Sequence, residues 1–460
     1  MTRKRPPQIR PRSLAALVVS LAAALHLPAH TQQDDPTERL TVDRAVALAL
    51  EHHPSALAAR ESVRAASAAV GELSALRLPH LAFEASATRF QEPMIVAPLH
   101  ALDITQAPDF DRTLLRGTAS ISYNLFDGGT RGARIRGARA EADAAEYSRE
   151  SAETSLIALV TQTYLTALSL SDVLNAHNTR LSALESELAR VQNHYAEGTA
   201  ARVAVLRAEA AIAQAEAERV STASALEVAE QHLARLTGLS PSETSASRLV
   251  PVGLRQTEQT IDRETLVAQA AEFNPDLLRA RSRHESAISN KSAANALWLP
   301  KISLFGGYLG FGSGAGDFTA EWQGGAKISY PVFTGGSRTN TITRTDAMVE
   351  LAHQEVRHAE LAIRDGVDRG LNAVHESRAR VSAVEDAVYH LEEVARIERL
   401  ALDAGSGTQA EYLRSEAELL RARASLIEAR NGEIMARIQL ARTLGQLTTD
   451  WLDRELESTR

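Results

Sequence analysis

Histidine is the residue type in this chain that could most readily bind a metal or move a proton, but the histidine spacing favours neither chemistry. His52 and His53 precede Pro54, and no third ligand follows at a helical or hairpin spacing. His353 and His358 are five residues apart rather than four, so they would not share a helix face well. A zinc site needs three or four convergent ligands. We therefore expect surface histidines, no bound metal and no cofactor.

Patterns for phosphate binding and nucleophilic catalysis are no stronger. A glycine run superficially resembles a phosphate loop, but it precedes a predicted strand and lacks the Lys-Ser/Thr ending; it comprises Gly310, Gly312, Gly314 and Gly316. We interpret this run as a hairpin turn. Serine, histidine and aspartate are scattered without the spacing of a nucleophile elbow. The sequence therefore predicts a protein that is not an enzyme.

The first 29 residues have the pattern of a secretory signal peptide. Five basic residues come first, a short apolar core spans 14–27, and Pro28-Ala29 is a plausible end. We find no later apolar run that looks long enough to cross a bilayer as a helix. Export without a spanning helix predicts a periplasmic, extracellular or outer-membrane protein.

Composition further limits the possible fold and partners of the chain. There is no cysteine, which excludes disulfides and a lipid attached to an N-terminal cysteine. The formal net charge is −8, or about −13 once the five basic residues of the signal peptide are removed. A chain this acidic argues against nucleic acid as a partner. Aromatic residues make up only 4% of the chain, which favours long helices packed closely side by side over a large globular core.

One unit occurs twice in the chain. The segment 206–210 (LRAEA) returns as 413–417 (LRSEA), and 126–129 (FDGG) returns as 333–336 (FTGG), both at a shift of 207 residues. Upstream the shift is 221, which relates His53-Pro54 to Asn274-Pro275. A period this long lies far above that of solenoid arrays. The chain is therefore a duplicated half.

The repeat divides the chain into five parts. They are a signal peptide (1–29), a first repeat (30–239), a linker rich in Ser, Thr and Pro (240–261), a second repeat (262–447) and a C-terminal tail (448–460). Each repeat reads as a helix, a β-hairpin, a very long helix, a tip and a return helix. The opening helices are predicted at 40–78, with Thr41 as N-cap, and at 262–297; Pro54 and Pro275 break or kink them.

After Pro79 and Pro300 the hydrophobic period changes from 3.6 to 2. In the first repeat Ala119, Ile121, Tyr123 and Leu125 alternate with polar residues, and the second repeat alternates likewise. Each predicted strand has about ten residues, which suits a tilted transmembrane strand with apolar residues outward. The alternative is a soluble hairpin with one buried face, and the chain offers no other core against which to bury it. The first hairpin connection, 92–112, is long and the second, 312–317, is short, which accounts for the change of shift.

Four such strands cannot close into a barrel with a lumen. An open sheet exposes strand edges that would stay unsatisfied in lipid. Three copies would supply twelve strands and a lumen, so membrane insertion predicts an oligomer.

The remaining segments have a helical period. The stretch 130–197 contains no proline and would measure ~100 Å as one straight helix. Its seam steps by three and four residues, as in a coiled coil: Leu181, Leu184, Leu188, Val191 and Tyr195. Return helices are predicted at 206–236 and 413–444, the latter with the seam Leu413, Ala417, Leu420, Ala424, Ile427, Asn431, Ile434 and Ile438.

At this point the sequence resembles the TolC-type outer-membrane efflux proteins. The segments that carry the resemblance, in order and twice over, are the paired helix starts at Leu40-Thr41 and Asn274-Pro275, the Leu-Pro stops at 78–79 and 299–300, the LFDGG and VFTGG segments at 125–129 and 332–336, and YAEGT at 195–199 with its image. Together they cover roughly 40–447.

The resemblance implies a fold that is mainly α with transmembrane β. Long coiled-coil helices would form a periplasmic α-barrel, and the four strands of each chain would contribute to a 12-stranded β-barrel in the outer membrane of a homotrimer. The tips, around Gly198, Thr199, Gly405, Gly407 and Thr408, would meet a periplasmic adaptor (membrane fusion) protein, which links them to an inner-membrane transporter.

The resemblance also implies a pore aperture behind the second tip. Acidic residues ring the closed periplasmic mouth in that family, and the matching position here is Glu411. Arg414 stands where a second acid often lies, and Ala204 occupies the matching place in the first half. The alternative for Glu411 is a solvated carboxylate on a helix face.

Three functions remain open at this stage. The first is a passive outer-membrane efflux duct of a tripartite pump or type I secretion system, which contacts outer-membrane lipid. The second is a periplasmic coiled-coil adaptor without a barrel. The third is an exported enzyme, for which the sequence offers no arrangement of catalytic residues. The sequence does not select among drugs, metal cations and polypeptides as the substrate.

Overall fold

The computed structural model describes residues 39–96, 105, 110–255, 262–316 and 318–458. The predicted signal peptide, Asp317 and parts of the first hairpin connection, the linker and the tail lie outside the described residues. Within 39–460 the chain forms one compact unit.

Each repeat opens with two short helices separated at a proline. In the first, α1 (Val42–His52) and α2 (Pro54–Ala75) meet at His53; in the second, α5 (Arg263–Phe273) and α6 (Pro275–Asn295) meet at Asn274. The predicted break is thus confirmed in both repeats. Each proline takes the first helical position, where its missing N–H costs nothing. The residue before it caps the new helix: the His53 Nδ1 accepts from the Ser55 N–H, and the Asn274 amide oxygen accepts from two N–H groups.

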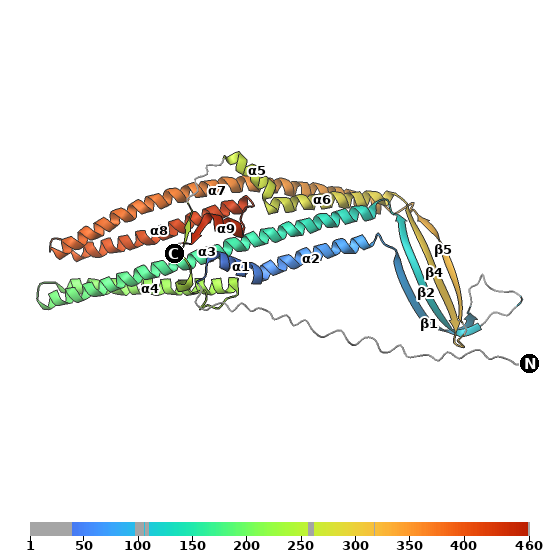
Figure 1. Ribbon diagram of the computed structural model, residues 1–460, viewed down its shortest axis with the longest axis horizontal. Helices are drawn as coiled ribbons and strands as arrows, with labels where there is room; N and C mark the ends of the chain where they lie inside the picture. The colour runs from blue at the N-terminus through green and yellow to red at the C-terminus, as the bar shows by residue number, and fades with distance from the viewer. Residues whose placement is uncertain (1–38, 97–104, 106–109, 256–261, 317, 459–460) are drawn as a thin grey trace, which may run out of the picture. The chain divides into compact units, whose positions relative to one another are not determined.

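Two antiparallel hairpins follow and join into a single sheet of order β1-β2-β4-β5 (Figure 1). The strands are β1 (His80–Ile95), β2 (Phe110–Phe126), β4 (Lys301–Ser313) and β5 (Phe318–Ser329). They contain 16, 17, 13 and 12 residues, so the predicted length of about ten was too short. Part of the first hairpin connection pairs beyond a register shift after Arg89, where Met94 faces Asp111.

A very long helix leaves each hairpin, and a shorter one returns beside it. These are α3 (Thr130–Ala196) with α4 (Arg202–Thr237), and α7 (Ser337–Asp403) with α8 (Gln409–Thr443). Both long helices contain 67 residues, as the duplication requires. Gly129 and Gly336 precede them with φ of 89° and 82°, a left-handed conformation that favours glycine at the turn from strand to helix.

The predicted seam of the second return helix is wrong near its tip. There the residues buried against α7 are Leu419 and, more shallowly, Ala422 and Leu426, which pack on Val388 and Ala395. The predicted stripe of Leu413, Ala417 and Leu420 is only half-buried. Ile434 and Ile438, nearer the core, are buried as expected. The predicted spacing of three and four residues between buried positions was correct. Which residues occupy those positions depends on the helix that α8 faces.

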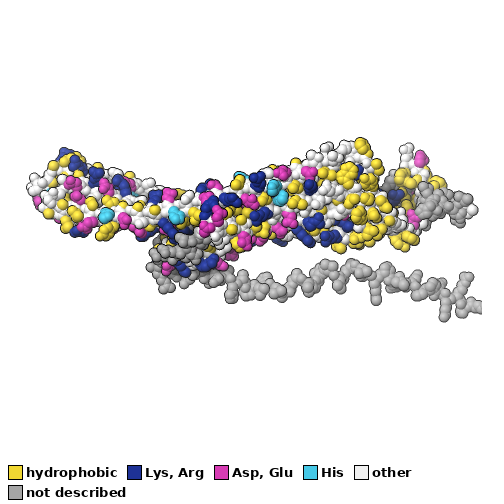
Figure 2. All heavy atoms as spheres, turned by 90° about the horizontal axis from the view of Figure 1, so that it is seen from above, with side chains coloured by type: hydrophobic (Ala, Val, Ile, Leu, Met, Phe, Trp, Pro, Cys, Tyr) yellow, Lys and Arg dark blue, Asp and Glu magenta, His cyan; other side chains and the backbone are white. Residues whose placement is uncertain are grey.

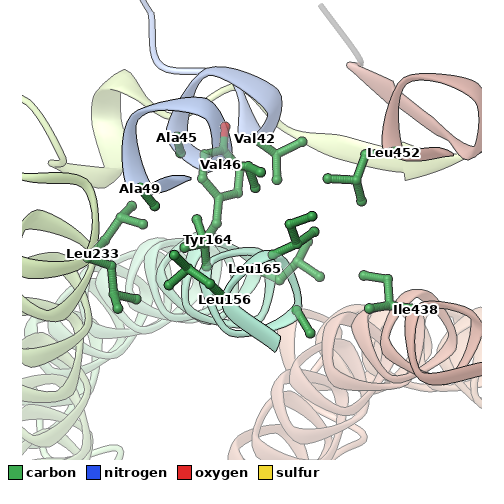
Figure 3. Close-up of a cluster of buried hydrophobic side chains, with 14 of the residues drawn as sticks. Val42, Ala45, Val46, Ala49, Leu156, Tyr164, Leu165, Leu233, Ile438 and Leu452 are labelled. Atoms are coloured by element: carbon green, nitrogen blue, oxygen red, sulfur yellow. The ribbon is translucent and has the colours of Figure 1, made fainter. Parts of the chain in front are cut away.

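The main hydrophobic core gathers around Tyr164 of α3. Figure 3 shows side chains of α1, α3, α4, α8 and the tail helix α9 (Thr449–Glu455) converging there, among them Val46, Leu233, Ile438 and Leu452. The Tyr164 hydroxyl lies 2.7 Å from the Leu40 carbonyl oxygen and accepts a hydrogen bond of 2.8 Å from the Val250 N–H. This one side chain therefore ties the start of the first repeat to the linker between the repeats.

The expectation that no later segment could cross a bilayer as a helix is wrong by length and composition. Helix α3 contains an 18-residue window of mean hydropathy 1.3, half of which is buried within the chain. The stretch 154–171 has no charged residue and carries Leu156, Ile157, Val160 and Tyr164 of the main core. Its apolar character is accounted for by that core.

The linker and the tail form structure that the sequence did not predict. Strand β3 (Val252–Leu254) of the linker pairs with β6 (Leu456–Ser458) of the tail, and the tail helix α9 (Thr449–Glu455) packs against α1. A short 3-10 helix, η2 (Ala246–Arg248), precedes β3, and another, η3 (Ala296–Trp298), follows α6. Such pairings join segments some 200 residues apart, so no local pattern announces them.

Two carboxyl groups meet where α9 packs on α1. Burial raises the pKa of Asp43 to about 6, and the charge of Asp453, with which it shares a hydrogen bond, raises it further in the same direction. One oxygen of Asp43 is buried without a hydrogen-bond partner. The folded chain therefore holds a proton at Asp43 more tightly than the unfolded chain does.

The sign of the resulting pH dependence follows from that raised pKa. The stabilising contribution of this pair is complete below the unfolded value near 3.8 and is lost as the pH rises through about 6. We expect Asp43→Asn to raise the thermal stability at pH 7.5 and to raise it clearly less at pH 5, where part of the contribution is still present. Thermal unfolding of the purified protein at both pH values measures this. Asp450→Asn, an exposed position on α9, is the control, and an equal effect of Asp43→Asn at both pH values would contradict the assignment.

Candidate functional site

One face of the four-stranded sheet is apolar and uncovered. The strand pairings place Phe83, Ala119, Tyr308 and Trp322 in one row across all four strands. Phe83 is 76% exposed and Trp322 74%. Figure 2 shows hydrophobic side chains gathered over the strands, whereas charged side chains of both signs cover the helices. The predicted apolar face is therefore confirmed, and it is large and presented to the surroundings.

The opposite face is mixed rather than purely polar. It carries the predicted Thr118, Ser120 and Lys327, but also aromatic rings that the alternation did not foresee. Phe305 lies over its partner Gly325, where a Cβ would come within 3.1 Å of the ring. The Arg116 guanidinium lies 5.6 Å from the Phe311 ring centroid. The missing side chain of Gly325 leaves room for the Phe305 ring over the sheet.

The sheet is open at both sides. Strands β1 and β5 each have one sheet neighbour in the described part of the chain, so each has an unpaired edge. The sheet presents both an apolar face and open edges, and one protomer cannot satisfy them in a membrane.

A pair of arginines, missed by the sequence reasoning, anchors the strand-to-helix junctions. Arg131 of α3 donates to the Leu76 carbonyl at 3.2 Å, and Arg338 of α7 donates to the Leu297 carbonyl at 3.5 Å. The arginines are related by the 207 shift and the leucines by the 221 shift. Each arginine thus ties the start of a long helix to the end of the short helix before it.

Aromatic rings complete both junctions. The guanidinium of Arg131 lies 5.9 Å from the Tyr123 ring centroid, and that of Arg338 lies 5.5 Å from Tyr330 and 4.5 Å from Trp298. Tyr123 and Tyr330 are also 207 residues apart, so a search of the repeat for matching arginines and tyrosines could have found the pair. Arg131 adds an ion pair of 2.9 Å with Asp127, and Thr334 replaces that aspartate in the second repeat. These contacts fix the direction in which the helices leave the sheet.

The two turns that contain the predicted tip residues span 197–201 and 404–408 and have similar backbone conformations. Gly198 and Gly405 take φ of 75° and 73°, which favours glycine. The Thr199 N–H donates to the His194 carbonyl at 2.8 Å, and the Ser406 N–H donates to the Ala401 carbonyl at 2.9 Å, so both long helices end in the same manner.

The tips differ in how the return helix starts. The first begins after Ala201, which supplies no side-chain cap. The second begins with a capping box: the Glu411 N–H donates to the Thr408 hydroxyl at 3.2 Å, and the Thr408 N–H donates to the Glu411 carboxylate at 3.1 Å. Gly407 lies so close to α7 that a Cβ would be 2.9 Å from the Ala401 Cβ.

The two residues predicted at the pore aperture therefore have local partners in the protomer. Hydrogen bonds from the Thr408 side chain and backbone lower the pKa of Glu411, which is fully exposed. Arg414 is exposed and pairs with Glu418 at 3.0 Å, one turn along α8. The structure brings Glu411 to the tip beside Thr408 and turns Arg414 towards its own helix.

The histidines first considered as ligands have other surroundings. His53 caps α2, as described above, and His52 lies 3.8 Å from Glu51. The His353 ring packs at 5.6 Å from that of His284. Within the described residues, no group of three metal-ligating side chains of the histidine, cysteine or carboxylate type converges. Gly314 and Gly316 lie in the β4–β5 turn, as interpreted, but Gly310 and Gly312 lie within strand β4, so the hairpin-turn interpretation holds for only part of the glycine run.

A protomer with this order of elements, duplicated and carrying an unclosed apolar sheet, defines the class of outer-membrane channels with long periplasmic helices. The sequence profile described as outer membrane efflux protein matches residues 45–239 and 266–446, one range within each repeat. The chain belongs to that family. It is an outer-membrane efflux channel, with the sheet in the outer membrane and the helices in the periplasm.

Individual proteins of known sequence or structure agree. The outer membrane protein TolC of Vibrio cholerae is 22% identical over 319 residues, 68% of this chain and 72% of that protein. The pyoverdine export outer membrane protein OpmQ of Pseudomonas putida is 25% identical over 340 residues, 72% of this chain and 70% of that one. The crystal structure of VceC from Vibrio cholerae matches with a TM-score of 0.74 at 21% identity, covering 88% of this chain and 96% of that one. CmeC of Campylobacter jejuni matches with a TM-score of 0.76 at 17% identity, covering 90% of this chain and 88% of that one.

The capping box at the second tip is testable. We expect Thr408→Ala to weaken the start of α8 by about 1 kcal/mol, because it leaves N–H groups of the first turn without an acceptor. Hydrogen exchange at residues 409–412 should accelerate, while exchange at 202–205 stays unchanged. Ala201→Thr combined with Ala204→Glu builds the same box on α4 and should slow exchange there. Unaltered exchange in both variants would contradict the assigned role.

Proposed function

We propose that three copies of this chain form one continuous duct, with twelve strands closed into a barrel in the outer membrane. The observation that supports this proposal is the open four-stranded sheet with its exposed apolar face and two free edges. Edge-to-edge addition of β5 of one copy to β1 of the next satisfies the backbone groups of both. A barrel of twelve strands encloses a lumen, which four strands cannot.

The long helices extend that duct into the periplasm. Along the helices the order α2, α3, α6, α7 repeats the strand order β1, β2, β4, β5, since each of these helices packs on the next. Three such layers side by side make a cylinder of twelve helical positions continuous with the barrel. The arginine junctions keep layer and sheet in register.

The two tips dock a periplasmic adaptor protein, through which the duct reaches an inner-membrane transporter. Gly198, Thr199, Gly405, Gly407 and Thr408 form the turns, whose backbone carbonyls and N–H groups lie at the end of each helical pair. The difference between an uncapped and a capped return helix gives the adaptor two distinct surfaces per protomer. Specificity for one of the two tips follows from that difference.

Glu411 and Arg414 form the narrow end of the duct, beside the second tip. Three Glu411 carboxylates around one axis repel one another and attract cations. The capping box holds each carboxylate at a fixed place, and Thr408 keeps it ionised by lowering its pKa. The duct itself is passive. Small molecules or ions leave the cell along it, and the inner-membrane transporter supplies the energy.

The adaptor interpretation is not favoured. It requires a chain without membrane strands, whereas this sheet exposes an apolar face across all four of its strands. The match of both repeats to the outer membrane efflux protein family also disagrees with the adaptor interpretation.

Disulfide cross-linking across the strand edges tests the assembly. The chain has no cysteine, so introduced cysteines are unique. Ser86→Cys on β1 is combined in turn with Thr319→Cys, Gln323→Cys or Lys327→Cys on β5, all on one face of the sheet. We expect at least one pair to give a covalent trimer on a denaturing gel after oxidation, because edge pairing brings Cα atoms to about 5.5 Å.

A cysteine at Ser120 in the central strand β2 is the matched control with Ser86→Cys, since that strand is already paired on both sides. It should give no trimer. Monomer alone across the whole β5 panel would count against edge-to-edge assembly.

The aperture is tested separately, in planar lipid bilayers. Glu411→Gln removes the charge but keeps a side chain that can complete the capping box. We expect it to raise the resting conductance and to weaken block by divalent cations. Thr408→Ala disturbs the cap and keeps the carboxylate, so it separates the two roles. Should Thr408→Ala alter conductance while Glu411→Gln does not, Glu411 acts through the helix start and not through its charge.

A further inference from the structure

A cavity of about 390 Å³ lies between α3, α6 and α7 near their sheet ends, away from the tips and the aperture. Three guanidinium groups line it, from Arg134 of α3, Arg283 of α6 and Arg344 of α7. In the part of the chain that the structure describes, none of the three forms an ion pair with a carboxylate. The one carboxylate in the lining is Glu141, so the cavity is cationic overall.

The spacing of the lining residues shows on which side the cavity opens. Arg134 follows Arg131 by three residues and Glu141 follows it by ten, which places them on a neighbouring part of the same helix face. Thr341 and Met348 follow Arg338 at the same spacings and also line the cavity. The cavity therefore opens on the side to which the two junction arginines point.

That side is the apolar side of the sheet. Arg131 and Arg338 lie over Tyr123 and Tyr330. Tyr123 follows Ile121 by two residues along β2, so it lies on the same apolar face. The cavity thus faces the lipid side of the membrane-spanning sheet and not the lumen.

The cavity also lies at the level of a lipid headgroup. It begins at Leu297, next to the half-exposed Trp298, and includes Thr341 in the second turn of α7. Val332 and Phe333, in the connection from β5 to α7, are 86% and 88% exposed. Tryptophan and other exposed apolar side chains at a sheet end mark the membrane boundary, and a few residues beyond it, at ~1.5 Å per helical residue, lies the headgroup layer.

We propose that this cavity binds the phosphodiester headgroup of an anionic phospholipid in the periplasmic leaflet of the outer membrane. The inference goes beyond the duct itself and rests on the placement of the sheet in that membrane. Arg134 and Arg344, near the starts of α3 and α7, supply the donors for the phosphate oxygens. Arg283 lies ~20 Å from Leu297 along α6 and adds positive charge at the far end of the cavity. Asn290 supplies a neutral amide for the glycerol hydroxyls, and Leu297, at the membrane end of the cavity, contacts the start of the acyl chains. The Glu141 carboxylate repels a further negative charge of a ligand at its end of the cavity.

Native mass spectrometry of the full-length protein in detergent tests the site, with phosphatidylglycerol, phosphatidylethanolamine and inorganic phosphate as separate probes. We expect tighter binding of phosphatidylglycerol than of the zwitterionic lipid. Each single change Arg→Gln at the three positions should weaken it about fivefold, and the triple variant about a hundredfold, at roughly 1 kcal/mol per arginine.

The charge-matched control is Arg136→Gln with Arg139→Gln and Arg357→Gln. These arginines lie on the other side of α3 and α7 and line no part of the cavity. The control should bind the lipid as the unaltered protein does, and both triple variants should keep the thermal stability of the parent. An equal loss of lipid binding in the cavity variant and the control variant would show that only net charge matters. Unchanged binding in the Arg134, Arg283 and Arg344 variant would overturn the site. Equal binding of phosphatidylethanolamine, or stronger binding of inorganic phosphate, would overturn the assignment to an anionic lipid.

Discussion

The unpaired backbone groups along β1 and β5 are the constraint on which the rest of this structure depends. In hydrocarbon each N–H and C=O without a partner costs several kcal/mol, so a sheet inserted in lipid must close. In the proposed duct one chain contributes strands for a third of a barrel. The oligomer is then part of the fold itself, and Phe83 and Trp322, which are exposed on the protomer, face lipid.

Duplication solves a mechanical problem that follows from this constraint. A duct has to keep its helical layer in register with its sheet around the whole ring. The same arginine, tyrosine and leucine carbonyl recur at both strand-to-helix junctions, although Asp127 of the first junction has become Thr334 in the second. In the first junction an ion pair holds the guanidinium, whereas in the second Trp298 and Tyr330 enclose it. Two chemical solutions thus preserve one geometry.

The two tips show the opposite trend. Their backbone conformations are similar, but only the second return helix begins with a capping box. Glu411 therefore has two roles. It caps the start of α8 together with Thr408 and, in the proposed duct, it places a negative charge near the axis. A residue that serves both makes the aperture depend on the start of α8, and the corresponding Ala204 leaves the first half without either role.

The sequence by itself determined what is local or repeated. The periods of 3.6 and 2, the breaks at Pro54 and Pro275 and the glycines before each long helix specified the elements, and the 207 shift specified the duplication. Tertiary structure decided what depends on distant neighbours. The burial phase of α8 depends on which helix it faces, the β3–β6 pair joins segments far apart in the chain, and the apolar stretch of α3 lies in a core gathered from five helices. The raised pKa of Asp43 and the arginine cavity arise in the same way, because side chains acquire these properties only when folding brings separate elements together.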